Sequence, residues 1–166
     1  NHKMLFYSLS LIKEKLPKNW RLYCLGRDDG IKKNLIEFSK KIGIYKKIIW
    51  VETIKLENVL AKCDLGILCS NEEGLPNAIL EYLSSKIPVI TTDVGGCNEI
   101  IKNKKNGLVV KKNDHIKLSK AILDLYKNKK KAKKFANRGF VTVKNKFNLK
   151  KTLYKHENEY LNCLKP

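Results

Sequence analysis

The chain has 166 residues, which is the size of one ordinary domain. With 43% hydrophobic and 31% charged residues it has a globular composition, which excludes a disordered tail, a collagen-like fibre and a disulfide-rich miniprotein. Its apolar runs are far shorter than the roughly 18 residues that a membrane-spanning helix needs, and no signal peptide opens the chain. Because the chain begins at Asn1 and not at a methionine, we expect it to be part of a longer polypeptide.

The charge is strongly basic, at +19, with three arginines and 32 lysines against 16 acidic residues. Such a charge suits a nucleic acid, an anionic membrane face or a phosphorylated ligand. The alternative, which we favour, is a compositional bias towards Lys, Asn and Ile that leaves lysines on solvated helix faces. Because aromatic and basic residues do not alternate as in RNA-binding segments, we expect no nucleic-acid partner.

The five cysteines and three histidines predict neither a disulfide framework nor a metal site. The number of cysteines is odd, there is no CxxC pair, and the histidines are scattered. Cys24 and Cys69 lie in apolar runs, where a free cysteine behaves as a small hydrophobic residue. This usage fits the reducing cytoplasm.

Hydrophobic periodicity and turn residues predict helices that alternate with strands. The expected helices cover 3–16, a stretch around Leu35, Phe38 and Ile42 that ends at Gly43, 56–62 and 77–85. The expected strands cover 21–25, 48–51, 64–69, 88–92 and 108–110. From Asp114, an expected N-cap, the chain is predicted to be helical, with a solvated charge run at 127–134. A final amphipathic stretch holds Phe147, Leu153, Tyr154, Tyr160 and Leu161.

This alternation predicts an α/β fold in which helices cover both faces of a parallel sheet, followed by a helical extension at the C-terminus. Ligands of such sheets bind at the carboxyl ends of the strands. The loops in which a site is expected are therefore 26–30, 51–55, 70–76 and 92–97.

One stretch, Ser70-Asn-Glu-Glu-Gly-Leu-Pro-Asn-Ala-Ile-Leu-Glu81, leaves a predicted strand and enters a predicted helix. We expect Pro76 at the first helical position, where its missing N–H has no cost. The amides that follow then lack an intrahelical acceptor and, with the helix dipole, form an anion site; they belong to Asn77, Ala78 and Ile79.

Two carboxylates flank this anion site, because Glu73 lies in the loop before the helix and Glu81 one turn beyond Asn77. Gly74 allows a ligand to approach the backbone closely. Carboxylates accept hydrogen bonds from vicinal hydroxyls, so the arrangement fits a nucleotide diphosphate joined to a sugar. Two glutamates at this spacing also arise by chance in a charged protein, and the alternative is that both are ordinary surface residues.

Further motifs follow: Pro88-Val-Ile-Thr-Thr-Asp-Val-Gly-Gly96, then Glu99, then Asn106-Gly-Leu-Val-Val110. Together with Glu73 and Glu81, this pattern closely resembles the family 4 retaining glycosyltransferases, which have the GT-B architecture of two Rossmann-like domains. The resemblance covers almost the whole chain, as the C-terminal, donor-binding domain. It implies a Rossmann-like fold that forms one half of a GT-B enzyme.

The resemblance also implies roles for individual residues. Glu73, the catalytic candidate, would contact the donor sugar hydroxyls, Glu81 would bind the ribose, and Val51 with its neighbours would line the nucleobase pocket. Donor sugar and phosphates would be bound by Gly74, Leu75, Pro76, Asn77, Ala78 and Ile79.

The family retains the configuration at the anomeric carbon and usually needs no metal, so we expect no cofactor besides the UDP- or GDP-sugar donor. The acceptor would be a sugar or a lipid-linked sugar in glycan, lipopolysaccharide or capsule synthesis. The location would be cytoplasmic, with peripheral association at the inner face of the cell membrane.

The chain departs from the family pattern at several positions. Cys69 replaces the usual proline, Tyr82 an alanine, and Lys86 the glycine that ends the helix, where a left-handed lysine is strained by roughly 1 kcal/mol. The family's Arg and Lys that neutralise the diphosphate belong to a central strand and loop just before Asn1, and Lys3 is a stand-in in the wrong register. We therefore expect the isolated chain, without that strand and an N-terminal acceptor domain, to be inactive.

Other functional classes remain as alternatives. One is a non-catalytic module that binds nucleotide sugars, and another is a sugar-nucleotide epimerase of the same architecture, for which no acid/base residues are evident. A third is a basic protein that binds RNA or anionic lipid by charge alone.

Overall fold

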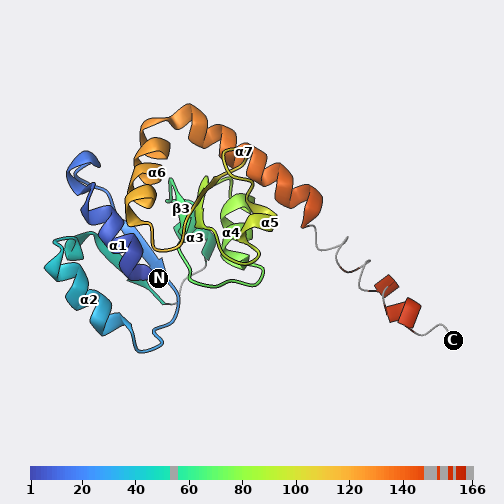
Figure 1. The fold of residues 1–166 in the computed structure, drawn as a ribbon, viewed down its shortest axis with the longest axis horizontal. Coiled ribbons are helices and arrows are strands. Elements are labelled where there is room, and N and C mark those ends of the chain that lie inside the picture. The colour runs from blue at the N-terminus through green and yellow to red at the C-terminus, as the bar shows by residue number, and fades with distance from the viewer. Residues whose placement is uncertain (53–55, 148–152, 154–156, 159, 164–166) are drawn as a thin grey trace.

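The computed structural model describes residues 1–52, 56–147, 153, 157–158 and 160–163. Within them, parallel strands form two ladders at the centre of the fold (Figure 1). The first ladder pairs β1 (Leu22–Leu25) with β2 (Ile48–Val51). The second has the order β3-β4-β5 and consists of β3 (Gly66–Leu68), β4 (Val89–Thr92) and β5 (Leu108–Val110). The expected strands and their parallel direction are confirmed, but the sheet is split between β1 and β3.

Helices connect the strands as the alternation predicts. In chain order they are α1 (His2–Ser10), α2 (Lys32–Lys41), α3 (Leu56–Leu60), α4 (Asn77–Ser84), α5 (Cys97–Ile100), α6 (His115–Lys127) and α7 (Lys129–Lys146), with 3-10 turns at Lys13–Lys15 and Tyr45–Lys47. The last two form the expected C-terminal extension, and Asp114 caps α6 by accepting the N–H of Lys117.

Two local expectations were wrong. The helix expected over 3–16 ends at Ser10, because the N–H of Ile12 bonds to the carbonyl of Leu9 and leads into the 3-10 turn. Helix α5 was not expected, since four residues are too few for a helical period. The charge run at 127–134 is largely exposed, as expected, and it also holds the junction of α6 and α7, where Asn128 caps α7 by accepting the N–H of Lys131. Of the final amphipathic stretch, Tyr154 lies outside the described residues.

Alternate residues of the second ladder point to two separate cores. Ile90, Leu108 and Val110 belong to a core shared with α1, α2 and α6, whereas Val89 and Val109 belong to one shared with α4 and α5. In Figure 1, α1 lies between α2 and α6, and α4 and α5 lie together beyond the strands. Helices thus cover both faces, and the expected Rossmann-like α/β fold is confirmed.

Two glycines allow α4 to pack closely on its neighbours. A Cβ at Gly139 of α7 would lie 2.3 Å from Leu83, and a Cβ at Gly66 of β3 would lie 2.5 Å from the ring of Tyr82. The bulky Tyr82 is therefore accommodated because the facing strand residue has no side chain. This packing fixes the axis of α4, and with it the position of the helix start.

The end of α4 is a Schellman motif. The N–H of Lys86 bonds to the carbonyl of Leu83, and the N–H of Ile87 bonds to that of Tyr82. Lys86 has φ +54°, so it has the left-handed conformation that its place in the family pattern implied.

Candidate functional site

Helix α4 begins at Asn77, as the expected range 77–85 has it, but Pro76 is not the first helical residue. Pro76 is the N-cap, with φ −76° and ψ 104°, and the helix begins at Asn77. Within the described residues, the N–H groups of Asn77 and Ala78 donate no hydrogen bond, whereas the N–H of Ile79 already bonds to the carbonyl of Pro76 at 3.1 Å. The helix start therefore offers two free donors to an anion, not the three expected.

Glu73 is held in the loop just before this helix start. The hydroxyl of Ser70 donates a 2.6 Å hydrogen bond to Oε1 of Glu73, and the hydroxyl of Thr92 donates a 2.8 Å bond to the carbonyl of Ser70. Glu73 is half-buried. The loop after β3 and the end of β4 together set the direction of this carboxylate.

Gly95 and Gly96 pack directly against the backbone of the loop that holds Glu73. A Cβ at Gly95 would lie 1.7 Å from the carbonyl oxygen of Glu73, and a Cβ at Gly96 would lie 2.2 Å from that of Gly74. The N–H of Gly96 also donates a 2.9 Å hydrogen bond to the carbonyl of Gly74. These contacts explain why positions 95 and 96 are both glycine, because only glycine allows the two loops to approach this closely.

The outer side of Gly74 is open, since a Cβ built there would meet no atom within 4 Å. Leu75 next to it is 50% exposed, and Asn77 is exposed as well. A ligand can therefore reach the backbone of the loop and the free amides from the solvent side.

The two remaining candidates occupy different places. Glu81 is exposed and lies on α4, one turn beyond Asn77. Val51 ends β2 in the other ladder, is half-buried, and accepts the N–H of Gly26 at 3.1 Å. The structure thus brings Glu73, Gly74, Asn77 and Ala78 together at one helix start, while Val51 belongs to the neighbouring ladder.

Sequence reasoning missed Ser70 and Thr92 as partners of the site. The available signal was the spacing of Ser70 and Glu73, three residues apart, because Ser and Glu side chains at this spacing often form local hydrogen bonds in turns and at helix starts. No local signal points to Thr92, because its contact with Ser70 depends on the pairing of β3 with β4.

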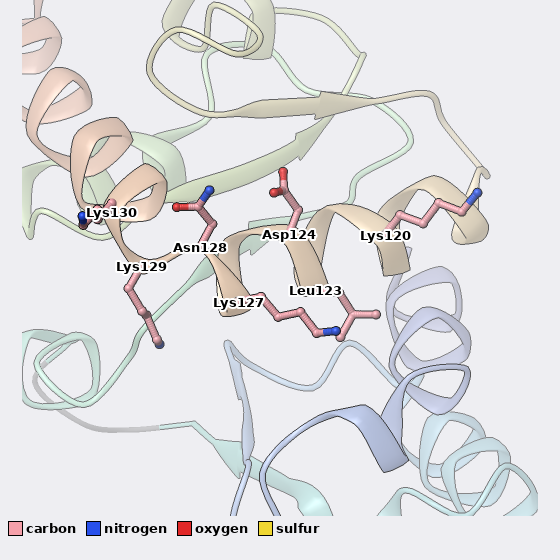
Figure 2. Close-up of a pocket in the computed structure, with 7 residues that line it drawn as sticks. All are labelled: Lys120, Leu123, Asp124, Lys127, Asn128, Lys129 and Lys130. Carbon is pink, nitrogen blue, oxygen red and sulfur yellow. The ribbon is translucent and has the colours of Figure 1, made fainter.

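A second concave surface lies at the corner between α6 and α7 (Figure 2). This hollow has a volume of about 670 Å³ and none of the predicted site residues lines it; its lining is Lys120, Leu123, Asp124, Lys127, Asn128, Lys129 and Lys130. In Figure 2, Lys127 and Lys129 project to one side of the corner, and Asp124 and Asn128 to the other. The described residues hold no cluster of three or more His, Cys, Asp or Glu side chains arranged for a metal ion, and none of their helices is long and apolar enough to cross a membrane.

Comparisons of the sequence and the fold with known proteins identify a family and several relatives. Residues 1–141 match the family described as glycosyl transferases group 1. The chain is 26% identical over 144 residues to the putative glycosyltransferase EpsD of Bacillus subtilis, a match that covers 86% of this chain and 37% of EpsD. The chain thus spans little more than a third of that relative.

Solved structures share the fold. The C-terminal domain of the group 1 glycosyl transferase LpcC from Francisella tularensis has a TM-score of 0.78 and 26% identity, over 89% of this chain and 80% of that domain. HepE from Anabaena in complex with UDP-glucose has a TM-score of 0.85 at 18% identity, over 97% of this chain and 44% of HepE.

Proposed function

The chain belongs to the glycosyl transferases group 1 family, and we propose that it is the donor-binding domain of a retaining hexosyltransferase that uses a UDP- or GDP-sugar. One observation carries the proposal: two free amides at the start of α4 lie directly after a loop that holds the Glu73 carboxylate in place. The free amides and the carboxylate suit the two parts of a sugar diphosphate, since amides bind the phosphate and a carboxylate binds the sugar hydroxyls.

The diphosphate binds at the amides of Asn77 and Ala78, where the helix dipole adds to their attraction. The Gly74–Pro76 backbone lines the sugar, and Glu73 accepts hydrogen bonds from its hydroxyls. Glu81 accepts those of the ribose, and Val51 borders the nucleobase. HepE, which shares the fold, was solved with UDP-glucose and so supports a donor of this kind.

In the transfer that we propose, the bond between the anomeric carbon and the phosphate oxygen breaks while an acceptor hydroxyl bonds on the same face of the sugar. The departing phosphate oxygen takes the hydroxyl proton, so no side chain of this domain acts as general base. The task of the site is electrostatic: the amides of Asn77 and Ala78 stabilise the negative charge that builds up on the diphosphate. No metal enters this scheme.

The acceptor site and complete activity belong to a longer enzyme in this proposal, because the chain covers only 37% of EpsD. In a two-domain transferase the reacting groups meet in the cleft between domains. A sugar or lipid-linked acceptor in cytoplasmic polysaccharide synthesis is our proposal for the other substrate.

The test separates the two glutamates with two ligands. Glu81→Ala should weaken UDP and UDP-glucose alike, by about tenfold or more, because a hydrogen bond to a charged group contributes about 1.5–3 kcal/mol. Glu73→Ala should weaken UDP-glucose in the same way and leave UDP unchanged. Calorimetric titration of both ligands measures this, with Glu72→Ala, an exposed neighbour, as the matched control. Equal losses of both ligands in both variants would contradict the assigned roles, and a preference for GDP over UDP would change only the base.

We also propose that the α6–α7 corner places the domain against an anionic membrane leaflet. Lysines gather there, and those at 127, 130, 133 and 134 are exposed and form no ion pair with any described residue. Lys131, by contrast, is paired with Asp124 at 2.6 Å. Unpaired lysines on one corner supply the charge for a lipid surface where lipid-linked acceptors are found.

A further inference from the structure

Three asparagines from distant parts of the chain meet at the carboxyl edge of the strands. Nδ2 of Asn1 donates one hydrogen bond of 2.9 Å to Oδ1 of Asn71 and another of 2.9 Å to Oδ1 of Asn113. Asn1 directly precedes α1, Asn71 follows β3 in the loop that holds Glu73, and Asn113 follows β5. We call Asn1, Asn71 and Asn113 the asparagine cluster. It connects the ends of two strands that are not neighbours in their ladder to the start of a helix.

Asn1 is the centre of the cluster because it uses both ends of its side-chain amide. Its Oδ1 accepts the N–H of Met4 at 3.3 Å and so caps α1, while its Nδ2 donates to the two other asparagines. The backbone carbonyl of Asn1 also accepts a bond from the Cys69 thiol at 3.4 Å, directly after β3. Serine or aspartate could cap the helix at this position, but neither has the two N–H donors that the cluster uses.

Asn113 is held in place independently of its bond to Asn1. Its φ of +63° is left-handed, a conformation that asparagine adopts more readily than most residues with a side chain. Asp114 next to it caps α6, and α6 packs on α1 through His115, whose ring centroid lies 4.7 Å from that of Tyr7. The starts of α1 and α6 therefore form a frame to which the asparagine cluster ties the loop after β3.

This tie holds the loop of Glu73 from a second side. On the side of β4, the loop is held by the hydroxyl of Thr92, which donates to the carbonyl of Ser70, and by the N–H of Gly96. On the side of α1, it is held through Asn71. Because the hydroxyl of Ser70 donates to Glu73 at 2.6 Å, a shift of residues 70 and 71 also moves the Glu73 carboxylate.

We propose that Asn1 is a positioning residue of the donor site, which through Asn71 sets where the Glu73 carboxylate lies. The inference rests on the proposed function, in which this carboxylate accepts hydrogen bonds from the donor sugar. The amides of Asn77 and Ala78 do not depend on the cluster, because the packing of α4 fixes the helix start. Loss of the cluster should therefore weaken the binding of the sugar and leave the binding of the diphosphate unchanged.

The experiment uses the full-length polypeptide that contains this chain and measures the affinities for UDP-glucose and UDP by calorimetry. Asn1→Ser keeps an oxygen that can cap α1 and removes the donor amide, whereas Asn71→Ala removes the acceptor. Each variant should bind UDP-glucose about fivefold more weakly, which is the usual net effect of one hydrogen bond, and should bind UDP within about twofold of the wild type. In the ligand-free protein, Asn1→Ser should shift the NMR amide signal of Glu73 and leave those of Asn77 and Ala78 in place.

Two further variants separate this contact from general effects. The double variant Asn1→Ser/Asn71→Ala should bind UDP-glucose no more weakly than either single variant, because both changes remove the same contact. Asn34→Ala is the matched control, since it removes an exposed asparagine side chain from α2 and should leave the affinity for both ligands unchanged. Additive losses in the double variant would overturn the proposal. Equal weakening of UDP and UDP-glucose would do the same, because it would show a merely structural role.

Glu73→Ala, measured alongside, distinguishes this inference from the proposed function. If Glu73→Ala weakens UDP-glucose while Asn1→Ser changes neither the affinity for UDP-glucose nor the amide signal of Glu73, the positioning role is overturned and the proposed function stands. If Asn1→Ser shifts the amide signal of Glu73 but Glu73→Ala leaves UDP-glucose binding unchanged, the proposed role of Glu73 fails, and the role of Asn1 at the donor site fails with it.

Discussion

The carbonyl oxygen of Glu73 lies against the backbone of Gly95, so closely that a Cβ at position 95 would be 1.7 Å from it. Gly95 also has φ +43°, a conformation that residues with a side chain rarely adopt. This contact packs the loop after β3 tightly against the loop after β4. The position of Glu73, and with it any contact of Glu73 with a ligand, therefore depends on Gly95, although Gly95 has no side chain that could contact the ligand itself.

Gly95→Ala should destabilise the domain by about 3 kcal/mol, because the methyl group must displace backbone and not a flexible side chain. Gly74→Ala is the matched control, since its Cβ would meet open space, and it should change the free energy of unfolding by less than about 0.5 kcal/mol. Urea unfolding followed by circular dichroism measures both. Equal stability of the two variants would show that the loops separate at little cost.

The sequence was sufficient to predict the strands, because each is an apolar run bounded by Gly, Pro or polar residues. It was also sufficient to predict the strand-to-helix turn that Gly74 and Pro76 mark, which the structure has between β3 and α4. It did not predict how the loop is held. Gly95 contacts Glu73 only because β4 pairs with β3, and such a contact is set by the sheet and has no local signal.

The free amide of Asn77 can be removed with little effect on the fold. Asn77 is the first helical residue and follows Pro76, whose ψ of 104° is compatible with a proline at position 77. Asn77→Pro should keep the melting temperature of Asn77→Ala and bind UDP about tenfold or more weakly, because it lacks the N–H donor to the charged phosphate. Asn77→Ala removes the same side chain and retains the amide. If both folded variants bind UDP equally, the diphosphate lies elsewhere.

The same helix start shows why Pro76 was expected inside the helix and is instead its N-cap. Proline is common at the first helical position, so the sequence favours Pro76 there. In the structure Pro76 is extended, and its carbonyl accepts the N–H of Ile79. A proline fixes φ but not ψ, and ψ decides whether the residue caps the helix or belongs to it.

Lys86 offers a test of backbone strain that is separate from the site. Its φ of +54° is unfavourable for a lysine, while its Nζ lies 4.8 Å from the ring centroid of Phe140 and gains a cation–π contact. Lys86→Ala loses the contact and keeps the strain, whereas Lys86→Gly loses the contact and relieves it. We expect the glycine variant to be more stable than the alanine variant by about 1 kcal/mol in urea unfolding. Equal stabilities would show that this Schellman motif tolerates a side chain without strain.

The lysines of the α6–α7 corner should bind anionic vesicles. The test variant replaces four of them with glutamine, namely Lys127, Lys130, Lys133 and Lys134. The control variant removes the same charge from exposed lysines in and near α2, namely Lys33, Lys40, Lys41 and Lys46. Both carry the same net charge, so a difference between them reports on the position of the charges and not on their number.

Co-sedimentation with phosphatidylglycerol vesicles at low salt should be strong for the wild type and the control variant. Each lysine near an anionic surface contributes about 1 kcal/mol, so the loss of four should weaken binding by about 100-fold or more. High salt should abolish the binding of every variant, because the Debye length falls to about 3 Å at 1 M. Equal losses in the two variants would mean that the overall charge of +19, and not this corner, attracts the membrane. Binding to neutral phosphatidylcholine vesicles as strong as to anionic ones would exclude an electrostatic attachment altogether, and the lysines would then serve as solvated surface.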